Sequence, residues 1–194
     1  MGVYLREFIE SYIKDSVEAK QDLLANTEML SIIEESAKAI TETFKAGGKV
    51  LAAGNGGSAS DAQHFTAELV GKFLYERPAL NAITLTNNNS IITAIGNDSG
   101  NDYIFARQVQ AYGKPNDIFV AISTSGNSKN IVLAIEEAKK IGLKVIGLTG
   151  KNKSLMDNMC DFIIKVPSDK TPVIQESHIM TEHIICALIE KEFM

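Results

Sequence analysis

The stretch AISTSGNSKN at residues 121–130 joins two segments of opposite character and decides which fold this chain can adopt. An apolar run of strand type at 117–123 leads into it, and a helical pattern at 131–140 follows it. A turn of hydroxyl side chains and glycine between a buried strand and a helix exposes backbone N–H groups where the helix dipole attracts anions. The stretch has neither the lysine-bearing P-loop pattern nor G-x-G-x-x-G. It therefore predicts a cradle for the phosphate group of a small metabolite.

A second stretch, GNGGSAS at 54–60, has the same arrangement as the first. A short apolar run at 49–53 precedes it, and a helical pattern at 61–73 follows it. Parallel sheets bind ligands at the carboxyl ends of their strands. Two such turns in one chain therefore predict two loops that face one cleft at the carboxyl edge of a sheet.

The rest of the chain continues the alternation of strands and helices. Three more apolar runs of strand length lie at 81–85, 144–148 and 161–166. Helical patterns separate the strands at 90–95, 103–112 and 131–141. Continuous apolar runs rich in β-branched residues, alternating with helices, are typical of a parallel sheet covered on both faces. We therefore expect a three-layer α/β fold with five parallel strands.

Helices are predicted at both ends of the chain. From Tyr4 to about Lys45 the apolar residues recur with helical spacing, with one break at Asn26–Thr27. The apolar stripe of the first helix either packs within the chain or forms a subunit interface. The last helix, at 172–193, has apolar residues nearly all round and is predicted to be largely buried. We expect residues 1–45 to form a helical extension for packing or oligomerisation and residues 46–194 to form one structural unit.

Composition narrows the class of protein. The chain has 194 residues, is 45% hydrophobic and carries a net charge of -5, with its 19 basic residues scattered. This argues against a dedicated nucleic-acid or anionic-membrane binder. Cys160 and Cys186 lie far apart in apolar patterns and predict buried thiols in a reducing compartment. With no apolar signal region and no run of membrane-spanning length, the expected location is cytoplasmic.

Two groups of polar residues are candidates for chemistry. His64 and Glu68 stand four residues apart on one face of the predicted helix after the first glycine loop, where they could share a metal or act as a base and its orienter. The last helix adds five polar residues within an apolar pattern: Gln175, Glu176, His178, Glu182 and His183. A cluster of this size needs a reason, because buried polar groups require partners. The plainer alternatives are a common exposed pair for the former, and core histidines with solvent-facing carboxylates for the latter.

Helical geometry does not choose between the two histidines of the last helix. At about 100° per residue, His183 lies about 80° from Gln175 on one side, and His178 lies about 60° from it on the other. Periodicity alone leaves both open.

The ordered set GNGGSAS, DAQHFTAEL, IGND, ISTSGNS, LTG and IQESHxxxEH resembles the sugar isomerase (SIS) domain family, and within it the bacterial phosphoheptose isomerases. ISTSGNS marks the superfamily, whereas His64 with Glu68 and Gln175 with His183 mark the isomerases. The resemblance implies a flavodoxin-like five-stranded parallel sheet and a homotetramer with active sites between subunits. It also implies conversion of sedoheptulose 7-phosphate to D-glycero-D-manno-heptose 7-phosphate, the first step toward ADP-heptose for lipopolysaccharide core or another surface polysaccharide.

The resemblance also assigns roles to residues. It implies that the phosphate is bound by hydroxyl side chains from both loops: Ser58, Ser123, Thr124, Ser125 and Ser128. It implies further substrate contacts from Asn55, Gly56, Gly57, Asp98 and Gln175. It implies that Glu68 and His183 transfer protons. It also implies that a zinc ion is bound by four residues: His64, Glu68, Gln175 and His183. By this resemblance His183, rather than His178, is the functional histidine.

These residue types suit the chemistry, because ketose–aldose isomerisation through an enediol needs a base, an acid and stabilisation of an oxyanion. A glutamate bound tightly to zinc is a poorer base, so the metal's part in turnover stays open. Lys72 stands where many relatives have arginine, and no aspartate directly precedes the IQE run, which leaves another phosphorylated ketose as an alternative substrate. The other alternative is a non-catalytic SIS protein that binds a replication initiator or senses sugar phosphates. The presence of both Glu68 and His183 favours catalysis.

Overall fold

The computed structural model describes residues 2–194, and its centre is a five-stranded parallel sheet in the order β2-β1-β3-β4-β5. The strands are β1 (Val50–Gly54), β2 (Ala82–Thr84), β3 (Ile118–Ile122), β4 (Lys144–Gly150) and β5 (Phe162–Val166). This is the flavodoxin-like order, in which the chain changes direction across the sheet between β1 and β3. The predicted fold class and strand positions are confirmed.

Seven α-helices and two short 3-10 helices accompany the sheet in the described part of the chain. The α-helices are α1 (Gly2–Ala25), α2 (Thr27–Lys45), α3 (Gly57–Val70), α4 (Asn89–Ser99), α5 (Ile104–Tyr112), α6 (Lys129–Ile141) and α7 (Thr171–Lys191). The 3-10 helices are η1 (Asn101–Tyr103) and η2 (Leu155–Asn158).

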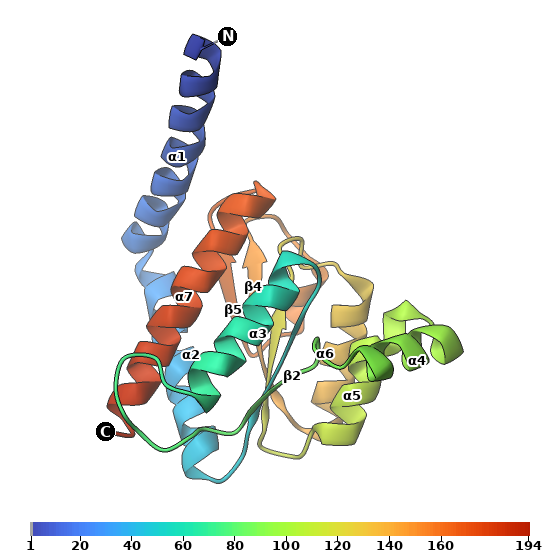
Figure 1. The fold of residues 1–194 in the computed structure, drawn as a ribbon. Helices are drawn as coiled ribbons and strands as arrows, with labels where there is room; N and C mark the ends of the chain where they lie inside the picture. Colours follow the sequence, from blue (N-terminus) through green and yellow to red (C-terminus); the bar gives the residue numbers. More distant parts are fainter. Residues whose placement is uncertain (1) are drawn as a thin grey trace.

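Both faces of the sheet are buried because its strands are apolar on both sides. In β3, Ile118 and Ile122 belong to a core cluster that includes residues of α2, α3 and α7. The alternate residues Phe119 and Ala121 belong to a second cluster built with α5 and α6. Figure 1 shows the resulting three layers, with α2, α3 and α7 on one side of the sheet and α5 and α6 on the other.

The N-terminal helices divide at the predicted break. The side chain of Asn26 caps α2 by accepting a hydrogen bond from the backbone N–H of Met29 at 3.0 Å. Whereas α2 lies in the core, α1 contacts the body from Asp15 onward, and its first half projects past the carboxyl edge of the sheet (Figure 1). Its apolar stripe is exposed at six residues: Tyr4, Leu5, Phe8, Ile9, Tyr12 and Ile13. Among the described helices, including α1, none has the length and apolarity needed to cross a bilayer.

The bounds of α3 differ from the prediction of a helix over 61–73. The helix begins at Gly57 and ends at Val70, so part of the predicted glycine loop forms its first turn. Gly56 allows this sharp entry, because its φ of 56° lies in a region that side-chain-bearing residues rarely adopt. Glycine and serine have low helix propensity, and for this reason the sequence pattern predicts a later start of the helix.

Candidate active site

The two predicted loops lie side by side at the carboxyl edge of the sheet. In the parallel pairing of β1 with β3, Gly54 is opposite Ile122, so the loops leave adjacent strands. The amides of Asn55 and Asn130 exchange two hydrogen bonds, at 2.9 and 2.8 Å, and join the loops directly. The loops therefore meet at the switch point of the sheet, where this fold class binds ligands.

The second loop gathers hydroxyl groups in front of a helix. The Oγ of Ser123 lies 3.0 Å from the Oγ of Ser128 and 3.5 Å from the Oγ of Ser125. The loop is fixed from behind by the backbone N–H of Gly150, which donates to the carbonyl oxygen of Thr124 at 3.0 Å. Because α6 begins immediately after Ser128, its free N–H groups add to the hydroxyl donors. Hydroxyl and N–H donors gathered in this way are suited to bind an anion such as a phosphate.

The remaining candidate residues lie along two neighbouring helices, α3 and α7. Both follow parallel strands, and both run away from the carboxyl edge on the same face of the sheet (Figure 1). Residues of α3 contact residues of α7 at a nearly constant separation in sequence along the whole pair of helices. Near the start, a Cβ added to Gly57 would lie only 2.5 Å from the amide nitrogen of Gln175. Further along, His64 meets His183, and beyond the end of α3 the backbone N–H of Phe73 donates to Glu190.

Three chemically active side chains meet at the middle of this helix pair. The Nε2 of His64 lies 2.9 Å from the Nε2 of His183 and 3.3 Å from Oε1 of Glu68. The side chain of His64 is 43% exposed and that of Glu68 is 21% exposed. A carboxylate and two imidazoles that are this close and open to solvent can take and return protons, or they can bind a metal ion.

The donor set fits a zinc ion. One ligand atom from each of His64, Glu68 and His183 lies within 4.8 Å of the other two. Two imidazole nitrogens bound to one tetrahedral zinc would be about 3.3 Å apart, close to their observed separation. Gln175 is set apart from these three, since eight residues of helix place it about 12 Å from His183 along the axis. In the single chain its side chain packs instead against Gly57.

The opposite side of α7 holds polar groups that are buried. His178 is 0% exposed, and its Nε2 donates to the carbonyl oxygen of Thr149 at 3.2 Å. Burial lowers the pKa of His178 to about 4. Both carboxylate oxygens of Glu182 are buried and have no hydrogen-bond partner among the described residues, and burial, followed by the charge of Asp61, raises the pKa of Glu182. Burial also raises the pKa of Asp61 to about 6. His178 is therefore a core histidine, as the plainer alternative predicted for a single histidine.

Sequence reasoning missed three residues beside the cluster. The ring of Phe73 stacks on the imidazole of His183, with centroids 5.0 Å apart and planes inclined by 20°. Arg77 and Glu190 form a buried ion pair at 3.3 Å, and their side chains are 0% and 1% exposed. A glutamate near the end of an apolar helix was the available signal for Glu190, whereas nothing in the local pattern marked Phe73 or Arg77.

Of the other predicted substrate residues, some lie next to the two loops and one, Asp98, lies away from them. Ser58 lies buried in the first turn of α3, directly after Gly56 and Gly57. Asp98 lies near the end of α4, where its carboxylate accepts a hydrogen bond from the neighbouring Asn97 at 2.8 Å. Within the described part of the chain, no hydrogen bond or ion pair of Asp98 reaches the two loops. Lys72, beyond α3, pairs with Glu76.

The doubly wound sheet with hydroxyl- and glycine-rich loops at its switch point is the arrangement that the resemblance to SIS domain proteins implied. The SIS domain family matches residues 11–150 of the chain. Similarity to curated proteins extends further. The chain is 49% identical to the phosphoheptose isomerase of Aneurinibacillus thermoaerophilus over 187 residues, which cover 96% of this chain and 94% of that protein.

Solved structures of phosphoheptose isomerases have the same fold as this chain. The phosphoheptose isomerase of Francisella tularensis superposes with a TM-score of 0.91 at 44% identity, over 95% of this chain and 97% of that one. The phosphoheptose isomerase of Neisseria gonorrhoeae superposes with a TM-score of 0.90 at 38% identity, over 96% of this chain and 99% of that one. The chain belongs to the phosphoheptose isomerases of the SIS domain family. The predicted family and enzyme class are thereby confirmed.

Proposed function

We propose that this chain converts sedoheptulose 7-phosphate to D-glycero-D-manno-heptose 7-phosphate, the first step toward ADP-heptose for surface polysaccharide. The observation that carries this proposal is the meeting of Glu68 with His64 and His183, on helices that start at the edge where the hydroxyl loops lie. A sugar-phosphate sensor would need the loops but not a base and an acid. The substrate named here is also the one that membership of the phosphoheptose isomerases supports.

In the proposed mechanism, Glu68 takes the proton from the carbon beside the ketone, and His183 exchanges a proton with the sugar oxygens. The loop hydroxyls of Ser123, Ser125 and Ser128 hold the phosphate, so the reacting carbons are presented in a constant orientation. The proton returned by Glu68 to the neighbouring carbon completes the aldose. His64, 3.3 Å from Glu68, keeps the carboxylate oriented.

Zinc is the proposed metal, held by His64, Glu68 and His183 with Gln175 as the fourth ligand. When bound, it would supply Lewis acidity that stabilises negative charge on the sugar oxygen. The position of Gln175, two helical turns from His183, favours its supply by a second subunit or by a movement of its side chain.

The proposed assembly is a homotetramer with active sites between subunits. Ser58 and Glu68 are ten residues apart on one helix, or about 15 Å along its axis. One chain therefore separates its phosphate loops from its proton-transfer group by more than a heptose phosphate comfortably spans. The exposed stripe of α1 projects past the same edge as the loops and supplies an apolar surface for a second copy (Figure 1). Cytoplasmic location is part of the proposal, in keeping with the two free cysteines.

The test is a direct assay of the purified protein with sedoheptulose 7-phosphate, with and without added zinc, following the appearance of the aldose. We expect turnover. A panel of C5 to C7 ketose phosphates run in parallel identifies the preferred chain length. If the protein binds sedoheptulose 7-phosphate but converts none of it under either condition, the proposed function is wrong.

A further inference from the structure

The orientation of His183 depends on neighbours outside the candidate catalytic set. Its ring has two aromatic contacts: an edge contact with His64 at a centroid distance of 5.1 Å, and the stacked ring of Phe73 at 5.0 Å. The contact with His64 is edge-on, and the side chain of His64 is 43% exposed, so it covers no face of the His183 ring. The stack with Phe73 is the contact that defines the plane of the imidazole, and with it the direction in which Nε2 points.

Phe73 itself lies in an irregular segment, residues 71–81, which has no ladder to hold it. The part of the segment that carries Phe73 is held by one carboxylate. Glu190, near the end of α7 and 0% exposed, accepts hydrogen bonds from the backbone N–H groups of Phe73, Leu74 and Tyr75 at 2.7, 2.7 and 3.1 Å. These donors and Arg77 outweigh the opposing effect of burial and keep the pKa of Glu190 below its ordinary value.

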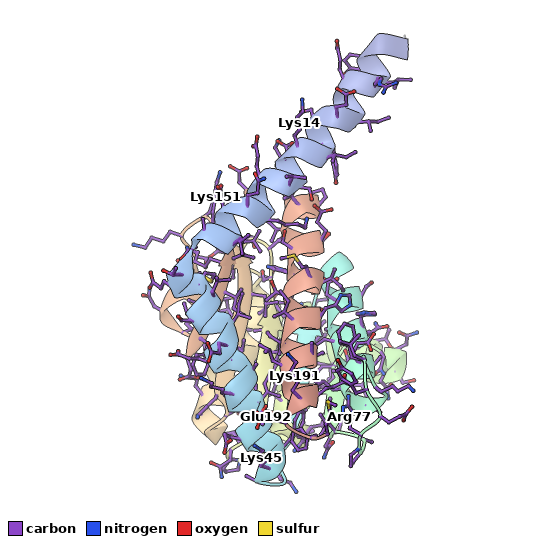
Figure 2. The ribbon with its side chains drawn as sticks, turned by 90° about the vertical axis from the view of Figure 1, so that its left-hand side faces the viewer. Lys14, Lys45, Arg77, Lys151, Lys191 and Glu192 are labelled. Carbon is purple, nitrogen blue, oxygen red and sulfur yellow. The ribbon has the colours of Figure 1, made fainter. Side chains whose placement is uncertain are left out.

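Arg77 connects the same carboxylate to the end of α3. Its guanidinium donates to the carbonyl oxygens of Glu68 and Leu69 at 2.6 and 2.8 Å, groups that have no partner within the helix because α3 ends there. Its Nε lies 3.3 Å from Glu190. Figure 2 shows Arg77 beside the last turns of α7. One buried ion pair therefore touches the backbone of Glu68 on one side and the backbone of Phe73 on the other.

We propose that Phe73 is a positioning residue for His183, and that the buried Arg77–Glu190 pair holds Phe73 and the end of α3 in place. Through this arrangement the base and the acid are set relative to each other by groups that never touch the substrate. The proposal rests on the proposed function for its kinetic consequence, but its structural consequence is measurable without any substrate.

The kinetic test compares three variants. Phe73→Leu keeps an apolar side chain but removes the flat ring, and we expect kcat to fall about tenfold with KM within about twofold. Phe73→Tyr keeps the ring and should restore kcat. Phe193→Leu is the matched control, because Phe193 forms an aromatic pair with Phe44, at 6.3 Å, away from the cluster. The proposal is overturned if Phe73→Leu keeps the wild-type kcat, if the tyrosine fails to restore it, or if both leucine variants lose kcat equally.

The second measurement is independent of activity. The chain has three histidines, so the imidazole C–H signals of a histidine-labelled sample can be assigned with single substitutions. We expect an upfield ring-current shift of the His183 signal that disappears in Phe73→Leu and persists in Phe73→Tyr and Phe193→Leu. A His183 signal that is the same with and without the Phe73 ring would overturn the proposal. If the wild-type protein lacks isomerase activity yet shows the shift, the proposed function fails and the positioning role stands.

Discussion

Two histidines lie five residues apart on α7, and their surroundings differ in every respect that matters for chemistry. His178 is fully buried, donates from Nε2 to the carbonyl oxygen of Thr149, and has its pKa lowered to about 4 by burial. His183 is part of an open cluster, with its Nε2 2.9 Å from that of His64 and its ring stacked on Phe73. One side of α7 packs into the core, and the other side faces His64 and Glu68 on α3.

The comparison teaches that burial, rather than helical angle, separates these two histidines. Both lie within a quarter turn of Gln175, so the helix itself could present either one. What excludes His178 is its neutral, hydrogen-bonded state inside the protein, where it cannot exchange protons with a substrate. Substitutions in the open cluster should therefore affect turnover, whereas substitutions among the buried polar groups of α3 and α7 should affect stability.

The largest effect is expected for Glu68→Gln. The substitution keeps the size and polarity of the side chain but removes the proposed base, so kcat should fall by about 10² to 10⁴-fold. Binding of the substrate phosphate, measured by calorimetry, should be nearly unchanged because Ser123 and Ser128 are untouched. Activity retained in this variant would remove Glu68 from the role of base.

His183→Gln should lower kcat by about 10²-fold, because it removes the proposed acid on the open side of α7. The midpoint of thermal unfolding should change little, since the side chain is not buried in the core. Steady-state kinetics and a thermal melt on the same sample are sufficient. If His178→Gln loses as much turnover per folded molecule as His183→Gln, the division between the two sides is wrong.

His178→Gln should affect stability instead. The pKa of His178 is about 4 in the folded chain and 6.5 ordinarily, so the unfolded state binds more protons between these values. Stability contributed by the neutral histidine is therefore complete above pH 6.5 and is lost as pH falls toward 4, by up to about 3 kcal/mol. Denaturant titrations across that range should show a flatter pH dependence in the variant. An unchanged dependence would show that His178 does not titrate in this way.

Asp61→Asn should give the smallest effect, with the opposite sign. The pKa of Asp61 is raised from 3.8 to about 6, mainly by burial, so the folded state binds more protons between these values. Wild-type stability should fall as pH rises through this range, and the variant should lack the fall and gain about 1 to 2 kcal/mol above pH 6. The same titrations measure it, and a variant less stable than wild type at pH 7 would contradict the expectation.

Much of the fold followed from local pattern. The five strands of the sheet, the break at Asn26 and the two loops at 54–60 and 121–130 were all predictable, because continuous apolar runs and glycine-rich turns act locally. The start of α3 was not, since Gly57 and Ser58 are poor helix formers that are placed in the first turn by the sharp entry at Gly56. The division at residue 45 into an extension and a main unit stays a prediction.

The site was predictable only in part. Glu68 and His64 were found from their spacing, and the choice of His183 came from family resemblance rather than from helical geometry. The meeting of α3 with α7 depends on which strands neighbour each other, and no local pattern contains that. For the same reason the contacts of Phe73 and Arg77 with Glu190 were not predicted: each forms only when residues more than a hundred positions apart are brought together.

The common register of α3 and α7 has a consequence for how this protein can change over evolutionary time. Gly57 with Gln175, His64 with His183, and Phe73 with Glu190 are separated in sequence by nearly the same number of residues. A substitution alters one of these pairs and leaves the others in place. An inserted or deleted residue within either helix would turn every later side chain by about 100° and separate the downstream pairs together. Lineages can therefore vary these helices by exchange of residues, but hardly by a change in their length.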